Sequence, residues 1–418
     1  MKEWALCLPG TFPRLGPHAG ALHALRDAAS RGLLDRDPSF VSTSSVSFIP
    51  SSIYIQRSEE EHVEFEKKLI NLRKRHFVSL HPDLKKRAIA DFLFIAGLLL
   101  AAHETGKVRN PLASHAALLA LSPLAYKITR KAVRDIFSVE SFLVYDNLRK
   151  LLLKTLKFDL IFNSPIKIEV PAVNLDTAGW TLDQILSDPP LYLEGWKNQG
   201  WVSVTNFRPE DVNLETEIRN LRYVNGGING LRVFGHINSG RHNGKGHIVD
   251  TAAISNLPVH FPVSEGYSNI VVLHYNSKAE GPLDRLFSNW VELLSRSFDI
   301  TVSEMTRKII VGWLRVNNDL EQLAEQRESL KRIEELLYYQ GLDSTSQQVI
   351  RRHIQDVEET MRNLSYAHKK IIKFLFVGSD PIPNAHFNDF TQGQIIEGIN
   401  KGWKAGWDAV PKINKMIA

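Results

Sequence analysis

The chain has 418 residues, of which 43% are hydrophobic and 23% charged, the composition of an ordinary soluble globular protein. Its formal net charge of +5 and pI near 9.0 are mildly basic, which permits attraction to anionic surfaces but does not imply nucleic acid as a partner. Cys7 is the only cysteine, which excludes an intrachain disulfide and favours a reducing, cytoplasmic location. The apolar runs Trp4 to Leu8 and Phe92 to Ala102 are too short for a signal peptide and a membrane span, respectively.

Two β-loop-α units are predicted at the start of the chain. The apolar run Trp4 to Leu8 ends at Pro9-Gly10, and a small-residue helical pattern begins near His18. A second β-prone run, Ser39 to Val41, ends in a cluster of hydroxyl residues, Ser42-Thr43-Ser44-Ser45-Val46-Ser47. Two such units in succession favour a parallel sheet.

The segment 59–157 has a helical pattern and is predicted to be a helical insertion or cap. Cations recur along it, for example at Lys67, Lys68 and Lys131. Two interpretations of these cations stay open. They form either the solvated face of surface helices or a surface that contacts an anionic membrane beside the apolar segment Phe92 to Leu100.

Strands alternate with loops and helices in the rest of the chain, which predicts a single α/β domain over 1–418. Further strands are predicted at 166–170, 201–204, 231–237, 270–274 and 373–377. Loops are predicted at Asp188-Pro189-Pro190 and Asn225-Gly226-Gly227. Helices are predicted over 286–313, 320–339 and 344–368, and a final helix over 387–407 ends near Pro411.

The segment 286–370 is predicted to be a long helical hairpin that packs on the core or projects from it. Its last two helices carry Glu, Gln, Arg and Lys interleaved on their polar faces. A hairpin packed on the sheet and a coiled coil that binds a partner are the two interpretations of this pattern.

The hydroxyl cluster after the second strand has the order of a nucleophile elbow without its glycines. A serine nucleophile is exposed by a sharp strand-to-helix turn, usually Gly-x-Ser-x-Gly. Around Ser44 the two glycine positions hold Ser42 and Val46. By itself the cluster is therefore either a catalytic serine turn or a buried strand followed by a serine-rich turn.

Three segments, in this order, resemble the motifs of the patatin-like phospholipases. That family has a glycine-rich oxyanion loop with an arginine after its first strand and a Gly-Thr-Ser-x-Gly elbow after its second. A later Asp-Gly-Gly or Asp-Gly-Ala segment runs on to Asn-x-Pro. The matching residues here are Gly10, Arg14 and Gly20 in the first segment, Thr43 and Ser44 in the second, and Asp250, Ala252, Asn256 and Pro258 in the third.

The resemblance implies a three-layer α/β fold with a mostly parallel central sheet and helical insertions. It also implies a serine-aspartate lipid acyl hydrolase, in which Ser44 attacks an ester carbonyl and Asp250 takes the proton from Ser44. The expected substrate is a phospholipid or lysophospholipid ester at a membrane surface, where the protein would be peripheral. No metal and no cofactor are expected.

The oxyanion hole implied by the resemblance consists of backbone N–H groups at Gly10, Thr11 and Ser45. Arg14 would add positive charge beside them.

Most departures from the family pattern are lost glycines. Non-glycine residues stand at six such positions, namely Thr11, Phe12, Leu15, Ser42, Val46 and Thr251. Glycine at such sites allows positive φ values and close approach of backbone N–H groups to a substrate. The alternative function is therefore a catalytically impaired patatin-like protein that binds lipid or acts as a regulatory or scaffold protein.

Overall fold

The structure is a computed structural model. It describes residues 3–10, 15–71, 79–80, 143–144, 146–174, 201–206, 214–229, 248–249, 257–275, 290–339, 343–364, 370–379 and 391–418. The predicted strand at 231–237 and most of the predicted insertion at 59–157 lie outside these residues.

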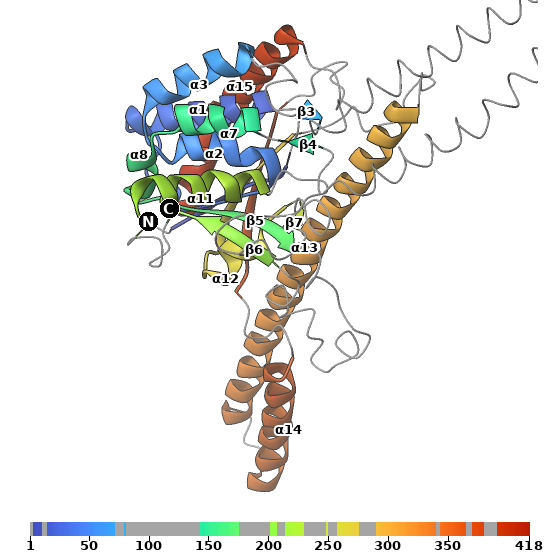
Figure 1. The fold of residues 1–418 in the computed structure, drawn as a ribbon. Helices are drawn as coiled ribbons and strands as arrows, with labels where there is room; N and C mark the ends of the chain where they lie inside the picture. Colours follow the sequence, from blue (N-terminus) through green and yellow to red (C-terminus); the bar gives the residue numbers. More distant parts are fainter. Residues whose placement is uncertain are drawn as a thin grey trace, which may run out of the picture.

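A mostly parallel sheet forms the centre of the molecule, as predicted (Figure 1). Its strand order is β6-β5-β2-β1-β8-β9, and β7 also pairs with β5. Five neighbouring strands, β5, β2, β1, β8 and β9, are parallel, whereas β6 and β7 run antiparallel to β5. The strands are β1 (Ala5–Leu8), β2 (Phe40–Thr43), β5 (Lys167–Asn174), β6 (Trp201–Thr205), β7 (Ile248–Val249), β8 (Asn269–Tyr275) and β9 (Lys373–Ser379). Two further short strands, β3 (Ser79–Leu80) and β4 (Leu143–Val144), pair only with each other.

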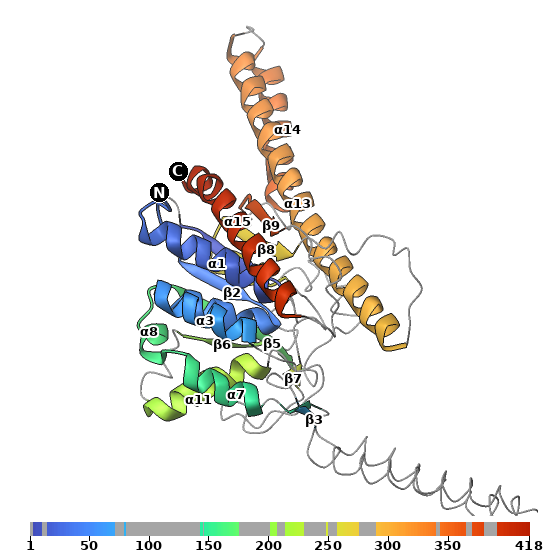
Figure 2. The ribbon, with the colours of Figure 1, turned by 90° about the horizontal axis from the view of Figure 1, so that it is seen from above.

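Helices cover both faces of this sheet, so the predicted three-layer α/β fold is confirmed (Figures 1 and 2). Side chains alternate between the faces, because successive strand residues point to opposite sides. Leu6 and Val41 belong to the larger core, on the side of α1 (Leu15–Ser30), whereas Cys7 and Val272 belong to a smaller core on the other side.

The larger core is covered by α1, α2 (Phe48–Tyr54), α3 (Glu59–Asn71), α7 (Asp146–Thr155), α8 (Phe158–Phe162), α11 (Thr216–Asn229) and α15 (Gln392–Ile417). The smaller core lies next to α12 (His260–Ser264) and the middle of α13 (Trp290–Tyr339). Beyond the sheet, α13 continues beside α14 (Ser344–Arg362), and the pair projects from the domain (Figures 1 and 2).

Two helix boundaries differ from the sequence prediction because of contacts with distant residues. Helix α13 is continuous where two helices were predicted. Its polar middle residue Asn317 donates from Nδ2 to the Ile372 carbonyl at 2.6 Å and accepts the Ile372 N–H at 2.9 Å. Helix α15 continues through Pro411, although proline inside a helix costs about 3 kcal/mol. Burial of Val410, Ile413 and Ile417 opposes that cost.

The predicted loop at Asn225-Gly226-Gly227 is wrong, because these residues lie inside α11. A Cβ atom added at Gly227 would lie 2.2 Å from Cε1 of Phe48. The glycine therefore lets α11 approach the aromatic ring closely, which local pattern alone does not reveal.

Helices α1 and α15 are in direct backbone contact. A Cβ atom added at Gly20 would lie 2.0 Å from the carbonyl oxygen of Ile399, and one at Gly402 would lie 2.0 Å from that of Pro17. Only glycine leaves room for this approach. The position of α1 therefore depends on α15.

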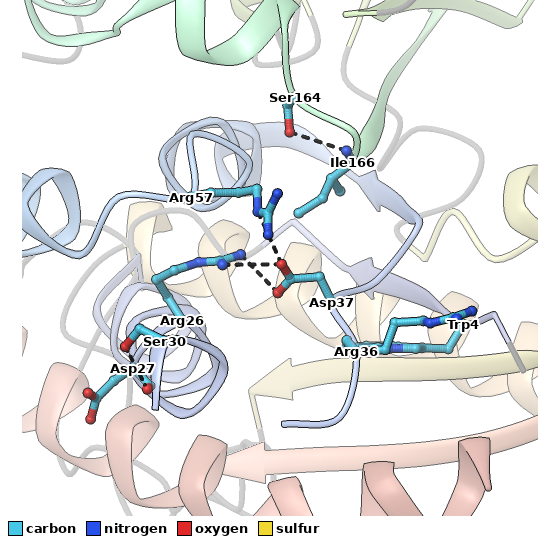
Figure 3. A network of polar contacts seen from close by, with 9 residues as sticks. All are labelled: Trp4, Arg26, Asp27, Ser30, Arg36, Asp37, Arg57, Ser164 and Ile166. Carbon is cyan, nitrogen blue, oxygen red and sulfur yellow. Dashed lines mark hydrogen bonds and ion pairs between the residues drawn. The ribbon is translucent and has the colours of Figure 1, made fainter. Parts of the chain in front are cut away.

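A polar network holds the opposite end of the first two strands (Figure 3). Arg26 of α1 donates two hydrogen bonds, at 3.1 and 3.2 Å, to the carboxylate of Asp37, which precedes β2. Arg57, after α2, forms an ion pair with the same carboxylate at 3.2 Å. The Arg26 guanidinium also lies 4.8 Å from the centre of the Tyr54 ring. One carboxylate thus joins α1, α2 and the start of β2.

We predict that Gly20→Ala and Gly402→Ala each lower the free energy of unfolding by about 1 to 3 kcal/mol or more, because the new methyl group overlaps backbone atoms. Gly312→Ala is the matched control. Its added Cβ meets nothing within 4 Å, so alanine should stabilise α13 by up to about 1 kcal/mol. Urea denaturation measures all three, and equal effects at the three sites would contradict the packing argument.

Candidate functional site

The turn after β2 has the backbone form of a strand-to-helix elbow. Ser44 is extended, with φ −111° and ψ 144°, and a 3-10 turn over Ser45–Ser47 leads directly into α2. Ser45 has φ 54°, and among the described residues only Arg57 shares a positive φ without being glycine. Such a conformation costs about 1 to 3 kcal/mol and tends to occur at functional sites. Ser44 is fully buried and Ser45 is 6% exposed.

The second and third sequence motifs meet at this turn. The Ser42 hydroxyl donates a hydrogen bond to the carbonyl of Pro258 at 2.9 Å. On the other side of the segment 250–256, Val249 of β7 pairs with Val173 of β5. In the sequence, Asp250 comes directly after Val249, which is paired with β5, and Pro258 of the same motif is hydrogen-bonded to β2. Asp250 itself lies outside the described residues, as do Thr11 and Arg14.

A buried hydroxyl–imidazole contact joins this turn to the first motif. Ser47 Oγ donates to the Pro9 carbonyl at 2.6 Å, and Nδ1 of His18 lies 2.9 Å from the same oxygen. Because the single hydroxyl hydrogen of Ser47 is used by Pro9, the contact with His18 needs a hydrogen on Nδ1. This arrangement ties together the end of β1, the start of α1 and the turn after β2.

Burial keeps the His18 ring neutral. Burial, and to a smaller extent the nearby His274, lowers the pKa of His18 to about 3. Burial also lowers the pKa of His260 to about 3 and that of His62 well below its ordinary value. The thiol pKa of Cys7 is raised by burial, which leaves this cysteine unsuited to act as a thiolate nucleophile.

The turns after β1 and β2 lie where parallel sheets place ligands. The strand order runs from β1 toward β2 and β5 on one side and toward β8 and β9 on the other. Such a reversal opens a crevice at the carboxyl ends of the strands, where α/β proteins bind their ligands. The N–H of Ser44 donates to the Leu8 carbonyl at 2.9 Å, so Ser44 and Ser45 lie beside the chain that leads into Gly10.

Sequence reasoning missed His18 and Ser47 as parts of the site. His18 stands near the start of the predicted first helix and is not among the residues that match a motif, and it is 2% exposed. The spacing of 29 residues between it and Ser47 belongs to no motif; only the fold brings them together. The left-handed backbone of Ser45 also left no sequence signal, since glycine is the usual sign of such a position.

In the part of the chain that the structure describes, no group of three or more His, Cys, Asp or Glu side chains is arranged to hold a metal ion. Among the same residues, no helix has a stretch both long and apolar enough to span a membrane.

We predict that stability falls as the pH drops from about 6.5 toward 3, because the unfolded chain binds protons that buried histidines exclude in the folded state. His18 alone contributes up to about tenfold per pH unit to this loss. In His18→Asn, where an amide N–H can replace Nδ1–H, the dependence on pH should be weaker. Urea midpoints measured across this range test it. The exposed His353→Asn is the control, and an unchanged slope in His18→Asn would count against the prediction.

No family model and no curated protein matches the chain. Among solved structures, the chain has a likeness to VipD from Legionella pneumophila, with 13% sequence identity and a TM-score of 0.34. The alignment covers 100% of this chain and 67% of that one. At these values the likeness establishes neither a shared family nor a shared function.

Proposed function

We propose that the protein is a serine ester hydrolase of the patatin-like type, acting on lipid esters at a membrane surface. The observation that carries this proposal is the left-handed Ser45 at a sharp turn between a parallel strand and a helix. An elbow of this kind presents a serine hydroxyl at the edge of a sheet. The contact of Ser42 with Pro258 supports it, because it brings the end of the Asp250 segment to the same strand.

The nucleophile in this proposal comes from the Ser44–Ser45 pair. The sequence motif favours Ser44, whereas the backbone favours Ser45, because an elbow nucleophile sits on a strained turn and Ser45 has a positive φ. If Ser45 is the nucleophile, Thr43 and Ser47 stand at the two positions that hold glycine in a Gly-x-Ser-x-Gly elbow. Val46, which crowds the turn if Ser44 is the nucleophile, then stands at neither glycine position and packs in the larger core.

In the proposed reaction, Asp250 removes the hydroxyl proton of the serine as its oxygen attacks the ester carbonyl carbon. The alcohol leaves with a proton, and water then hydrolyses the acyl-enzyme. Backbone N–H groups at Gly10, Thr11 and the residue after the nucleophile would stabilise the oxyanion. Removing one such donor costs about 10²- to 10³-fold in rate. Arg14 would add positive charge near the oxyanion.

A second candidate function is lipid binding without catalysis. The burial of both serines favours it, because a nucleophile must reach its substrate. The lost glycines around the turn point the same way.

We predict that a fluorophosphonate probe labels the wild-type protein and that peptide mapping places the adduct on Ser45. Ser45→Ala should lose labelling and lower the turnover of a short-chain nitrophenyl ester by about 10⁴- to 10⁶-fold. Ser44→Ala, which removes the neighbouring hydroxyl, is the matched control and should keep both.

An adduct on Ser44 would move the nucleophile by one residue and leave the hydrolase proposal intact. Labelling that persists in Ser44→Ala/Ser45→Ala would exclude this turn as the source of the nucleophile. A wild-type protein that neither reacts nor turns over would favour lipid binding without catalysis.

Asp250→Asn should lower ester turnover by about 10²- to 10⁴-fold, the usual contribution of a general base. The side chain keeps its size, so the thermal midpoint should change little. Asp356→Asn, on the exposed face of α14, serves as the control. Turnover within tenfold of wild type in Asp250→Asn would remove Asp250 from the mechanism.

A further inference from the structure

A cationic groove lies between α3 and α7, outside the candidate hydrolytic site. It has a volume of about 660 Å³. Four lysines and two asparagines line it, namely Lys67, Lys68, Lys150, Lys154, Asn71 and Asn147. The two helices that carry these side chains, α3 and α7, belong to the helical layer that covers the larger core (Figures 1 and 2).

The charges in this groove are poorly balanced. Among the described residues that line it, Glu64 is the one carboxylate, and it forms an ion pair with Lys68 at 3.2 Å. Lys150 and Lys154 are one helical turn apart, and like charges at this spacing destabilise a helix slightly. Lys154 in the last turn of α7 complements the helix dipole, whereas the one lining carboxylate of the described residues, Glu64, pairs with Lys68, so a bound anion would balance the charges of Lys67 and Lys150.

The chemistry of the lining suits a phosphate group. Lysine ammonium groups bind phosphate as compact point charges. Two side-chain amides also line the groove; that of Asn71 donates one N–H to the Lys67 carbonyl at 2.9 Å, which leaves its second N–H for a phosphate oxygen. Both amides are exposed at the ends of their helices, where a ligand can reach them.

Exposed apolar side chains beside the lysines favour a lipid surface over a soluble phosphate. Val63 is 37% exposed and lies one turn before Lys67 on α3. Leu153 is 38% exposed and immediately precedes Lys154 on α7. Cations interleaved with exposed apolar residues are typical of helices that lie in a membrane interface.

The groove shares part of its lining with a small apolar cavity. Lys68 and Leu151 line both the groove and a small apolar cavity beneath it. Leu15 and Ile49 line the same cavity, and they follow the turns after β1 and β2.

We propose that this groove binds the phosphate of anionic phospholipids and holds the protein on a membrane surface. The site is independent of the hydrolytic chemistry, because none of its described lining residues belongs to the serine turn. It binds a headgroup from the bilayer, and the exposed Val63 and Leu153 enter the interface around it.

Co-sedimentation with phosphatidylcholine vesicles, with and without phosphatidic acid, tests the proposal. The variant Lys67→Gln/Lys150→Gln/Lys154→Gln leaves the Lys68–Glu64 pair intact. A cation near an anionic surface contributes about 1 kcal/mol, which is about fivefold in affinity. The triple variant should therefore bind phosphatidic acid vesicles about a hundredfold more weakly than wild type.

The matched control is Lys331→Gln/Lys412→Gln/Lys415→Gln, which removes the same charge from exposed positions on α13 and α15. It should bind like wild type, and thermal midpoints should show that both triple variants are folded. Equal loss of binding in the two triple variants would mean that net charge alone determines vesicle binding, and the proposed site would be wrong. Unchanged binding in the groove variant would also overturn it.

Two further arms distinguish a lipid surface from a soluble phosphate and from uncharged lipid. If wild type binds soluble glycerol 3-phosphate through these lysines but does not bind vesicles, the groove is a phosphate site and the membrane assignment is wrong. Equal binding to pure phosphatidylcholine vesicles would likewise refute a role for the anionic headgroup. Ser44→Ala/Ser45→Ala should bind vesicles like wild type, so failure of the hydrolase proposal leaves this test intact.

Discussion

Backbone contact between α1 and α15 is the constraint on which the arrangement of this protein depends. Glycines on both helices, above all Gly20 and Gly402, let the two backbones touch where any side chain would separate them. Close-packed backbones gain many dispersion contacts but tolerate almost no added volume. Helix α1 therefore has one position over the sheet. Gly20 belongs to the first sequence motif, so the part of that motif on α1 is positioned by residues near the other end of the sequence.

Strand β2 is held firmly at both ends, which explains how its last turn keeps an unfavourable backbone. Asp37 binds two arginines before the strand, and Ser42 and Ser47 bind backbone carbonyls at its other end. Each such hydrogen bond contributes about 1 kcal/mol, and those to charged groups somewhat more. Together they exceed the cost of about 1 to 3 kcal/mol for a left-handed residue such as Ser45. These hydrogen bonds hold Ser45 in its left-handed conformation without a glycine at that position.

Local pattern predicted most of the fold and only part of the site. The parallel β-loop-α units and the helices on both faces follow from hydrophobic periodicity, which one sequence displays directly. The errors at Gly227 and Asn317 share a cause, since each residue is explained by a partner far away in the sequence. At the site, a motif locates the serine turn but cannot decide between Ser44 and Ser45. That choice depends on a backbone angle, which glycines usually mark and hydroxyl residues do not.

The pairing of α1 with α15 also sets an order of events during synthesis. Every described strand except β1 lies between these two helices in the sequence, so a growing chain exposes the glycine-lined face of α1 until α15 has been made. Contacts between such distant segments slow folding, and an uncovered apolar face invites association with other chains. Until α15 docks, α1 lacks the backbone contacts that α15 contributes. All three sequence motifs of the candidate site are therefore synthesised before α15 is available to pack on α1.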